Sequence, residues 1–198
     1  MVVICLTGMP GSGKSSMASA LRSKGFTTVE MGEIVRSIMR RRGMKIDNFT
    51  LRNFALQLRE RYGAMAVAKL TAREIRRKKG DIAVVGVRGS KEIEYFKEHI
   101  NDRIYVVAIT APQRVRYNRM IQRHRSDEVH SYSAFLWRER RELRYGVKGA
   151  MADADFIVSN AGTRRTLIKS ASELVASING PAQNRKKTKY LRAPNKNA

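Results

Sequence analysis

Residues 1–15 read Met-Val-Val-Ile-Cys-Leu-Thr-Gly-Met-Pro-Gly-Ser-Gly-Lys-Ser, and the rest of the chain is organised around them. A short apolar run rich in β-branched residues enters a glycine-rich turn, and a helical pattern begins at Lys14. The last eight residues fit Gly-x-x-x-x-Gly-Lys-Ser, the pattern of a phosphate-binding loop, without a mismatch. A chance glycine-rich turn is the alternative. The order of strand, loop and helix favours the phosphate-binding loop, which we call the P-loop.

The P-loop pattern has a physical basis in its glycines and in Lys14 and Ser15. The glycines let the backbone fold tightly enough for successive N–H groups to point into a concavity that suits phosphate. Lys14 adds a positive charge on the outer phosphates, and the hydroxyl of Ser15 can ligate Mg²⁺. We therefore predict that a nucleoside triphosphate, ATP or GTP, binds here with Mg²⁺. The residues predicted to bind it are Gly8, Met9, Pro10, Gly11, Ser12, Gly13, Lys14, Ser15 and Ser16.

The composition of the 198-residue chain limits the classes of protein that it can represent. Hydrophobic residues make up 42%, which predicts a folded domain with a core. The net charge of +23 predicts attraction to polyanions, namely nucleotides, RNA or an anionic membrane, and does not choose among them. No apolar stretch is long enough to span a bilayer, and the N-terminal apolar run leads into the P-loop rather than forming a signal peptide. These features predict an intracellular, cytoplasmic protein.

Apolar runs and helical patterns alternate along the chain. The apolar runs predict strands at residues 2–6, 26–29, 82–87, 104–109 and 154–158. The helical patterns fall at 14–22, 30–42, 51–61 after an N-cap at Thr50, 64–79, 91–99, 115–123, 134–145 and 163–178. This alternation predicts an α/β fold, a three-layer, doubly wound, five-stranded parallel sheet flanked by helices, with ligands at the carboxyl ends of the strands. Residues 1–180 form the predicted domain, and residues 181–198 form a basic tail predicted to be disordered.

Charged residues follow the second and third predicted strands. Glu33 and Arg36 lie three residues apart on one helical face after the second strand. From spacing alone, a surface ion pair is slightly favoured over a role for Glu30 or Glu33 beside an acceptor. Arg88, which follows the third strand, suits a bidentate grip on phosphate, with a solvated loop arginine as the alternative. Because the carboxyl ends of parallel strands meet at one edge of a sheet, these residues are predicted to share a crevice with the P-loop.

Residues 113–146 hold a dense set of arginines. Those before a polar loop are Arg114, Arg116, Arg119, Arg123 and Arg125, and those after it are Arg138, Arg140, Arg141 and Arg144. Two arginine-rich helices joined by a polar loop predict a lid that closes over transferring phosphates and neutralises their charge. A pair of solvated basic helices, or a face that binds polyanions, is the alternative.

Three further stretches carry a resemblance to a known family. They are Leu-Arg-Glu-Arg-Tyr-Gly-Ala-Met-Ala-Val-Ala at 58–68, Arg-Glu-Arg-Arg-Glu-Leu at 138–143 and Ala-Asp-Phe-Ile-Val-Ser-Asn at 154–160. With the P-loop and Met-Gly-Glu-Ile-Val-Arg at 31–36, they resemble an archaeal family of nucleotide kinases without an assigned substrate. That family is similar to adenylate kinase and dephospho-CoA kinase, in the P-loop NTPase superfamily. The resemblance extends from Val2 to about residue 175.

The resemblance implies an adenylate-kinase-like arrangement, with acceptor-side helices at about 30–80 and an arginine-rich lid at about 113–146. It implies a nucleoside triphosphate on the P-loop, Mg²⁺ at Ser15 and adenine near the backbone of residues 160–162. The candidate acceptor-binding residues are then Gly32, Arg36 and Arg88. The candidate catalytic residues are Lys14, Glu33, Arg119, Arg123 and Arg138, with Arg141 as another lid arginine.

One position departs from the pattern of that family. The relatives have an aspartate at the end of the third strand that holds the water shell of Mg²⁺, and this chain has Val85 there. Asp81 lies at the opposite end of that strand. Mg²⁺ is then held by Ser15, phosphates and water, with Glu30 or Glu33 across the crevice as candidate ligands. Loss of the acid affects turnover more than nucleotide binding, because phosphoryl transfer relies mainly on positioning and charge neutralisation.

Two hypotheses follow for the function. The first is a P-loop kinase that transfers the γ-phosphoryl group of ATP to a small anionic acceptor, a nucleotide or nucleotide-like molecule such as a nucleoside monophosphate. The alternative is an ATP-binding module with weak or no kinase activity that associates with RNA, for which the basic tail is a candidate contact. The lid and acceptor arginines favour the kinase, because a plain RNA-binding protein has no obvious need for them.

Overall fold

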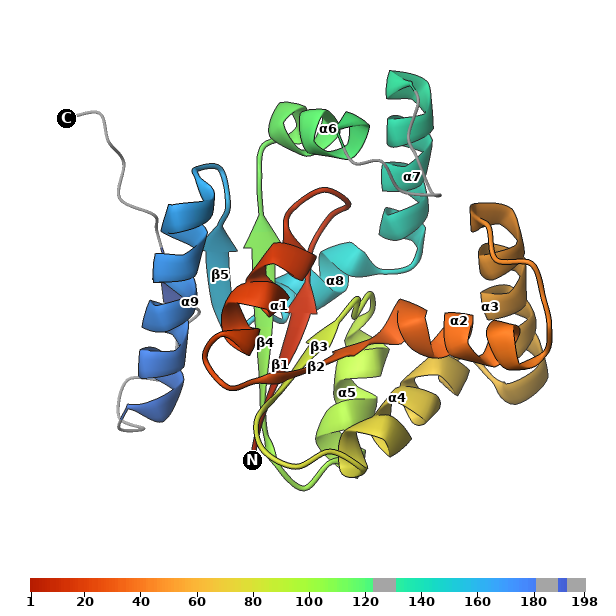
Figure 1. The fold of residues 1–198 in the computed structure, drawn as a ribbon, viewed down its shortest axis with the longest axis horizontal. Helices are drawn as coiled ribbons and strands as arrows, with labels where there is room; N and C mark the ends of the chain where they lie inside the picture. Colours follow the sequence, from red (N-terminus) through yellow and green to blue (C-terminus); the bar gives the residue numbers. More distant parts are fainter. Residues whose placement is uncertain (123–130, 181–188, 192–198) are drawn as a thin grey trace.

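The computed structural model describes residues 1–122, 131–180 and 189–191, and its centre is one parallel sheet (Figure 1). The sheet has six strands in the order β2-β3-β1-β4-β5-β6, and each is parallel to its neighbours. The strands are β1 (Val2–Thr7), β2 (Thr27–Glu30), β3 (Ile82–Val85), β4 (Arg103–Thr110), β5 (Phe156–Ser159) and β6 (Lys189–Leu191). This order places β1, the strand that enters the P-loop, between β3 and β4 in the middle of the sheet.

Helices cover both faces of the sheet. They are α1 (Lys14–Arg22), α2 (Met31–Arg41), α3 (Asn48–Tyr62), α4 (Ala66–Arg76), α5 (Ser90–His99), α6 (Gln113–Ile121), α7 (Tyr132–Arg144), α8 (Val147–Ala152) and α9 (Arg164–Asn179). The helices α1 and α9 pack on one face, and α4, α5 and α8 pack on the other (Figure 1). This arrangement confirms the predicted parallel sheet flanked by helices. In the described part of the chain, no helix combines the length and the apolar character that a bilayer crossing requires.

The strand β1 contributes to the core on both faces of the sheet. Val2, Ile4 and Leu6 point to the side of α1 and α9, whereas Val3 and Cys5 point to the opposite side. All five side chains are at most 1% exposed. A continuous apolar run is therefore what this position in the sheet requires.

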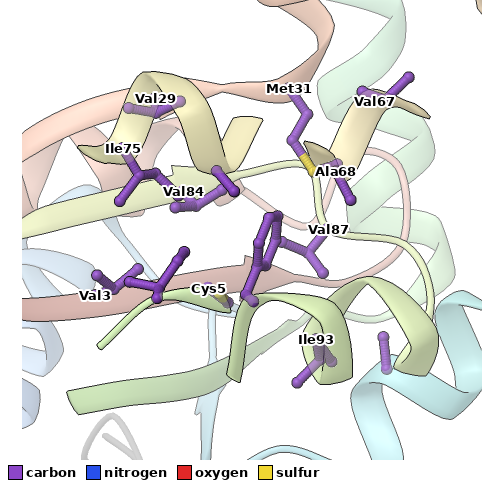
Figure 2. Close-up of a cluster of buried hydrophobic side chains, with 14 of the residues drawn as sticks. Val3, Cys5, Val29, Met31, Val67, Ala68, Ile75, Val84, Val87 and Ile93 are labelled. Atoms are coloured by element: carbon purple, nitrogen blue, oxygen red, sulfur yellow. The ribbon is translucent and has the colours of Figure 1, made fainter. Parts of the chain in front are cut away.

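The core on the second face extends from the sheet into the helices that follow β2. Met31 of α2 and Val67 and Ala68 of α4 belong to the same cluster as Val87, which follows β3 (Figure 2). These contacts hold α2 and α4 against the end of β3. The core thereby positions the segments from which Arg88 and the residues of α2 approach the P-loop.

The prediction of five strands was wrong, because the chain adds a sixth at the edge of the sheet. The strand β6 pairs in parallel with β5, with Tyr190 opposite Ile157 and Leu191 opposite Val158. Leu191 packs against the core cluster on the side of α1 and α9. The polar, basic composition of the tail hid this strand, because a three-residue edge strand gains its order from the ladder of β5 and one apolar contact. The rest of the predicted tail, residues 181–188 and 192–198, lies outside the described residues.

Two helices also differ from the sequence-based prediction. The helix α3 begins at Asn48, and its N-cap is Asp47 rather than Thr50. The Asp47 carboxylate accepts a hydrogen bond from Thr50 N at 2.9 Å, and Thr50 Oγ1 accepts one from Asp47 N at 3.0 Å. This capping box places Thr50 inside the first turn. The six-residue α8, which follows Gly146, was not predicted because it is too short to show a helical period.

Candidate active site

The P-loop joins β1 to α1 and depends on three glycines with positive φ. Gly8, Gly11 and Gly13 have φ of +139°, +76° and +101°, values that residues with a side chain rarely adopt. A Cβ at Gly8 would collide with the carbonyl oxygen of Ile109, and one at Gly13 would collide with the side-chain amide of Asn160. The glycines are therefore required by the backbone conformation and by the close approach of β4 and of the residue that follows β5.

Side chains hold the P-loop in this shape. Lys14 Nζ donates hydrogen bonds to the carbonyl oxygens of Gly8 at 2.6 Å and Met9 at 3.1 Å. The buried amide of Asn160 donates to the carbonyl oxygen of Ser12 at 2.8 Å. Donors within the protein, the Lys14 ammonium and the Asn160 amide, thus satisfy these three carbonyl oxygens of the loop. This arrangement suits a loop whose N–H groups serve a phosphate.

The residues of the P-loop fit a nucleoside triphosphate with Mg²⁺. Lys14 opens α1, whose N-terminus favours negative charge through the helix dipole. The hydroxyl of Ser15, in the first turn of α1, is an oxygen ligand of the kind that Mg²⁺ prefers. Among the described residues, no three Asp, Glu, His or Cys side chains gather to hold a metal ion. Mg²⁺ on this loop would therefore depend on phosphate and water oxygens more than on carboxylates.

A cavity of about 160 Å³ brings together residues that the sequence marked as candidates. Gly32, Arg36, Arg88 and Arg138 all line it. Its other lining residues are Met31, Val35, Leu51, Arg52, Ala55, Arg59, Val67, Arg141, Glu142 and Tyr145. The helices α2, α3, α4 and α7 and the segment after β3 each contribute to it. We call this space the arginine cavity.

Arg88 enters the arginine cavity from the end of β3 and is held by three contacts. Its Nε donates to Glu142 Oε2 at 2.8 Å, and its Nη1 donates to the carbonyl oxygen of Gly86 at 2.9 Å. Its backbone N–H donates to the carboxylate of Glu92 at 2.8 Å. Burial by itself would lower the pKa of Arg88, but the carboxylates of Glu142 and Glu92 outweigh it and raise the pKa above its ordinary value. Arg88 is therefore a fixed positive charge at the edge where β1 also ends.

Glu142 of α7 is the carboxylate of the arginine cavity. Burial by itself would raise its pKa, but Arg88, Lys14 and Arg141 lower the pKa below its ordinary value. The side chain is only 11% exposed, yet it stays ionised near neutral pH. The Gly86 N–H, two residues before Arg88, donates to the carbonyl oxygen of Leu6 at 3.3 Å. The arginine cavity, which Arg88 lines, therefore lies at the edge of the sheet where β1 leads into the P-loop.

A buried ion pair joins α6, α7 and the P-loop. The Arg116 guanidinium contacts the Glu139 carboxylate and also donates to the carbonyl oxygen of Pro10 at 3.3 Å. Gln113 Nε2 donates to the other oxygen of Glu139 at 2.6 Å. Arg116 and Glu139 are 8% and 6% exposed, and Arg116 lies over the ring of Phe135. The two arginine-rich helices are therefore connected to each other and to the P-loop.

Arg119, another predicted lid arginine, does not line the arginine cavity. Arg119 Nη1 donates to the carbonyl oxygen of Asn160 at 2.8 Å, and its Nη2 donates to that of Gly162 at 3.4 Å. Burial lowers the pKa of Arg119. Arg119 thus contacts the backbone beside which the resemblance implies adenine. Arg123 lies outside the described residues.

Glu33 also lies outside the arginine cavity. Its carboxylate contacts Arg40 and accepts a hydrogen bond from Arg36 Nε at 2.7 Å. The hydrogen bonds from Arg40 and Arg36 lower the pKa of Glu33 below its ordinary value. Glu33 and Arg40 line a separate groove between α2 and α4. The ion pair that spacing favoured for Glu33 and Arg36 is therefore present.

Sequence reasoning missed Arg52, Arg59 and Glu142 as site residues. Arg52 and Arg59 are seven residues apart, which places them on one face of α3 and was a usable signal. Glu142 follows Glu139 by three residues on the basic helix α7, and both are buried. Two acidic residues on one face of an arginine-rich helix indicate that they form ion pairs with basic residues inside the protein.

Comparisons with known proteins place the chain in a family. Residues 4–141 match a family model described as AAA domain. A UPF0200 protein of Saccharolobus islandicus is 41% identical over 162 residues, which are 80% of this chain and 84% of that protein. The chain belongs to the UPF0200 family of AAA-domain proteins. A UPF0200 protein of Pyrococcus horikoshii is 34% identical over 181 residues, which are 89% of this chain and 97% of that protein. Both relatives are archaeal, as the resemblance implied.

Solved structures share the fold of this UPF0200 protein. The crystal structure of TT1252 from Thermus thermophilus has a TM-score of 0.63 at 20% identity and covers 90% of this chain and 98% of its own. A shikimate kinase from Acinetobacter baumannii in complex with shikimate has a TM-score of 0.57 at 16% identity and covers 91% and 95%. At such low identity these likenesses show the fold alone. That fold is the α/β arrangement of P-loop kinases.

Proposed function

We propose that this UPF0200 protein is an ATP-dependent kinase that transfers a phosphoryl group to a small anionic acceptor. The observation that carries the proposal is the arginine cavity, which is lined by Arg36, Arg88 and Arg138. Arg88 enters it just after β3, at the edge of the sheet where β1 leads into the P-loop. Solvated basic helices would leave such arginines in water, whereas here they line a concave space with an apolar side. GTP is an equally suitable donor for the P-loop.

The P-loop holds the phosphate donor in this proposal. Its N–H groups and Lys14 bind the outer phosphates, and the positive end of α1 adds to the attraction. The Ser15 hydroxyl would hold Mg²⁺ together with phosphate oxygens, and the ion would supply charge neutralisation on the leaving phosphates. Arg119, on the carbonyl oxygens of Asn160 and Gly162, borders the place proposed for the base.

The arginine cavity holds the acceptor. Arg36 and Arg88 bind its anionic group, and Gly32 lines the cavity beside the Arg36 guanidinium. The terminal phosphorus–oxygen bond of ATP breaks, a new bond forms to an acceptor oxygen, and ADP leaves. Arg138 stabilises the charge of the transferring group. The helices α2 to α4 form the proposed acceptor-side segment, and α6 and α7 form the proposed lid.

Glu142 replaces Glu33 as the acid of the site in this proposal. Glu142 lies in the arginine cavity and holds Arg88 through a 2.8 Å hydrogen bond, whereas Glu33 faces a separate groove. Because its pKa is lowered, Glu142 is a weak base. Its role is to position Arg88 and to place a negative charge opposite Lys14.

The neighbours and the resemblance support a small-molecule acceptor. Two structural neighbours are named as kinases of small molecules, a shikimate kinase and a gluconokinase. The resemblance to adenylate kinase implies a nucleoside monophosphate. Neither the family match nor these neighbours support the alternative of an RNA-associated module.

A phosphoryl-transfer screen tests the proposal. The purified protein is incubated with γ-labelled ATP and Mg²⁺ and with nucleoside monophosphates, dephospho-CoA, shikimate or gluconate in turn. We expect a labelled product with at least one acceptor class, a phosphoester if the acceptor oxygen is a hydroxyl and a phosphoanhydride if it belongs to a phosphate, and no label transfer by Lys14→Ala. The control is Lys24→Ala, which removes an exposed lysine just beyond α1 and should transfer normally. ATP binding without transfer to any acceptor would contradict the proposal.

A further inference from the structure

The arginine cavity contains more guanidinium groups than a single anionic group can bind. Six arginines line it, against a single carboxylate, Glu142. Glu142 holds Arg88, and Arg36 is paired with Glu33 from outside the cavity. A phosphate group engages one or two guanidinium groups through bidentate hydrogen bonds. Arginines beyond those two therefore call for another explanation.

Arg52, Arg59 and Arg141 form a second group in the arginine cavity, at the meeting of α3 and α7. Within the described ranges, no carboxylate lies in ion-pair distance of Arg52 or Arg59. Arg141 lies 3.8 Å from Glu142, and its buried Nε has no hydrogen-bond partner among those residues. Burial and the charges of Arg138 and Arg52 lower the pKa of Arg141, against the opposing effect of Glu142. These guanidinium groups repel one another until an anion comes between them.

Aromatic rings hold this second group in place. The Cζ atoms of Arg52 and Arg141 lie 5.2 Å and 5.0 Å from the ring centre of Trp137. The Cζ of Arg59 lies 5.7 Å from the ring centre of Tyr145. A ring face fixes the direction of a guanidinium and leaves its N–H edge for a ligand. Trp137 is therefore a positioning residue for two of the three arginines.

The two arginine groups come from different parts of the fold. Arg88 follows β3 and Arg36 lies on α2, near the end of the sheet where the P-loop begins. The second group belongs to α3 and α7. The apolar part of the cavity wall consists of Met31, Val35, Leu51, Ala55 and Val67. A volume of about 160 Å³ limits what can fill the space to a small molecule.

We infer that the acceptor of this kinase carries two anionic groups, one held by Arg36 and Arg88 and the other by Arg52, Arg59 and Arg141. This inference rests on the proposed function only in that it takes the arginine cavity as the acceptor site. It defines a class: a compact molecule with a phosphate or carboxylate at each end and an apolar or sugar-like middle. A neutral sugar, or an acid with one anionic group, leaves the second arginine group without a ligand.

Binding of simple phosphonates tests the inference without nucleotide. The probes are alkane bisphosphonates of graded chain length and the matching alkyl monophosphonates, and affinity is measured by calorimetry. Trp137 is the single tryptophan of the chain, so its fluorescence reports on the second arginine group directly. We expect at least one bisphosphonate to bind about tenfold more tightly than its monophosphonate partner and to change Trp137 emission.

Substitutions locate the second anionic group. Arg52→Gln or Arg59→Gln should remove most of the tenfold advantage and leave monophosphonate binding within about twofold. Arg164→Gln, an exposed arginine of α9, removes the same charge elsewhere and should change neither affinity. Circular dichroism confirms that each variant is folded. Equal affinity for both probe classes, absence of binding, or an unchanged advantage in both α3 variants would overturn the inference. Since no ATP is present, failure of phosphoryl transfer leaves this result standing.

Discussion

The P-loop and the arginine cavity meet at one edge of the sheet, but they recognise anions in different ways. The P-loop uses backbone N–H groups, three glycines with positive φ and Lys14, all within one short stretch of sequence. The arginine cavity uses side chains from α2, α3, α7 and the segment after β3. Backbone recognition is tied to a local pattern, whereas side-chain recognition depends on how distant segments pack. The first should tolerate almost no substitution, and the second should change its ligand gradually as single arginines are replaced.

The largest expected effect on phosphoryl transfer comes from a substitution in the P-loop. Lys14→Ala removes the charge on the outer phosphates and should lower the rate of phosphoryl transfer by about 10³-fold or more, with the fold intact. Single-turnover kinetics with labelled ATP measures the rate, and thermal unfolding measures the stability. A loss below about tenfold would show that the loop relies on its backbone alone.

The next largest effect is on stability and concerns the buried ion pair of Arg116 and Glu139, which joins α6, α7 and the P-loop. Arg116→Met leaves the Glu139 carboxylate buried without its partner and should lower the free energy of unfolding by about 3–5 kcal/mol. Arg116→Met combined with Glu139→Leu should recover most of that loss, because no unpaired charge remains. Arg114→Met, on the exposed side of α6, is the matched control. Chemical denaturation measures all three. Equal stability of the single and double variants would contradict a paired, buried role.

A smaller effect is expected from Glu142 in the arginine cavity. Glu142→Gln removes the ion pair with Arg88 and should lower the transfer rate by about tenfold and the unfolding free energy by about 1–2 kcal/mol. The folded-state pKa of Glu142 is lowered, so this stability is present above the unfolded pKa and is lost as pH falls through the folded pKa.

Acid titration separates this role from a general loss of packing. Between neutral pH and the acid range, the wild type should lose more stability than Glu142→Gln, whose side chain does not titrate. The control Glu98→Gln changes an exposed glutamate of α5 and should follow the wild type. Parallel pH curves for wild type and Glu142→Gln would argue against an ionised Glu142 in the folded protein.

The smallest effect is expected from the C-terminal residues 181–198, which belong to neither the P-loop nor the arginine cavity. Removal of residues 181–198 takes away β6 and the contact of Leu191 with the core. Because β6 is a three-residue edge strand, we expect a loss of about 1 kcal/mol or less and an unchanged transfer rate. Thermal unfolding and the labelled-ATP assay are the measurements. A large loss of activity would mean that the tail contributes to the site.

The sequence predicted the sheet and the P-loop because both have local signals. The apolar run of β1 and the Gly-x-x-x-x-Gly-Lys-Ser pattern encode a strand and a loop whose conformations depend on neighbouring residues. The sequence did not predict β6, because Lys189–Leu191 has too few apolar residues to show a pattern. It placed the N-cap of α3 at Thr50 because the pairing of Asp47 with Thr50 is visible only in the fold.

The site was predicted in part, and the errors have one cause. Arg36, Arg88 and Arg138 were identified and share the arginine cavity. Arg52 and Arg59 were overlooked, because on α3 they resembled ordinary solvated residues. Their seven-residue spacing indicated a shared face of α3, but whether that face lines a cavity or faces water depends on the side chains of α7 that it meets, such as Trp137 beside Arg52.

Phosphorus NMR of the protein with ATP, Mg²⁺ and candidate acceptors tests the central claim most directly, because it separates transfer from hydrolysis. We predict loss of the γ-phosphate resonance with equal gain of ADP and of a new phosphoester or phosphoanhydride resonance, given an acceptor with two anionic groups. Conversion of ATP to ADP and inorganic phosphate alone, or no conversion with any acceptor, would contradict it.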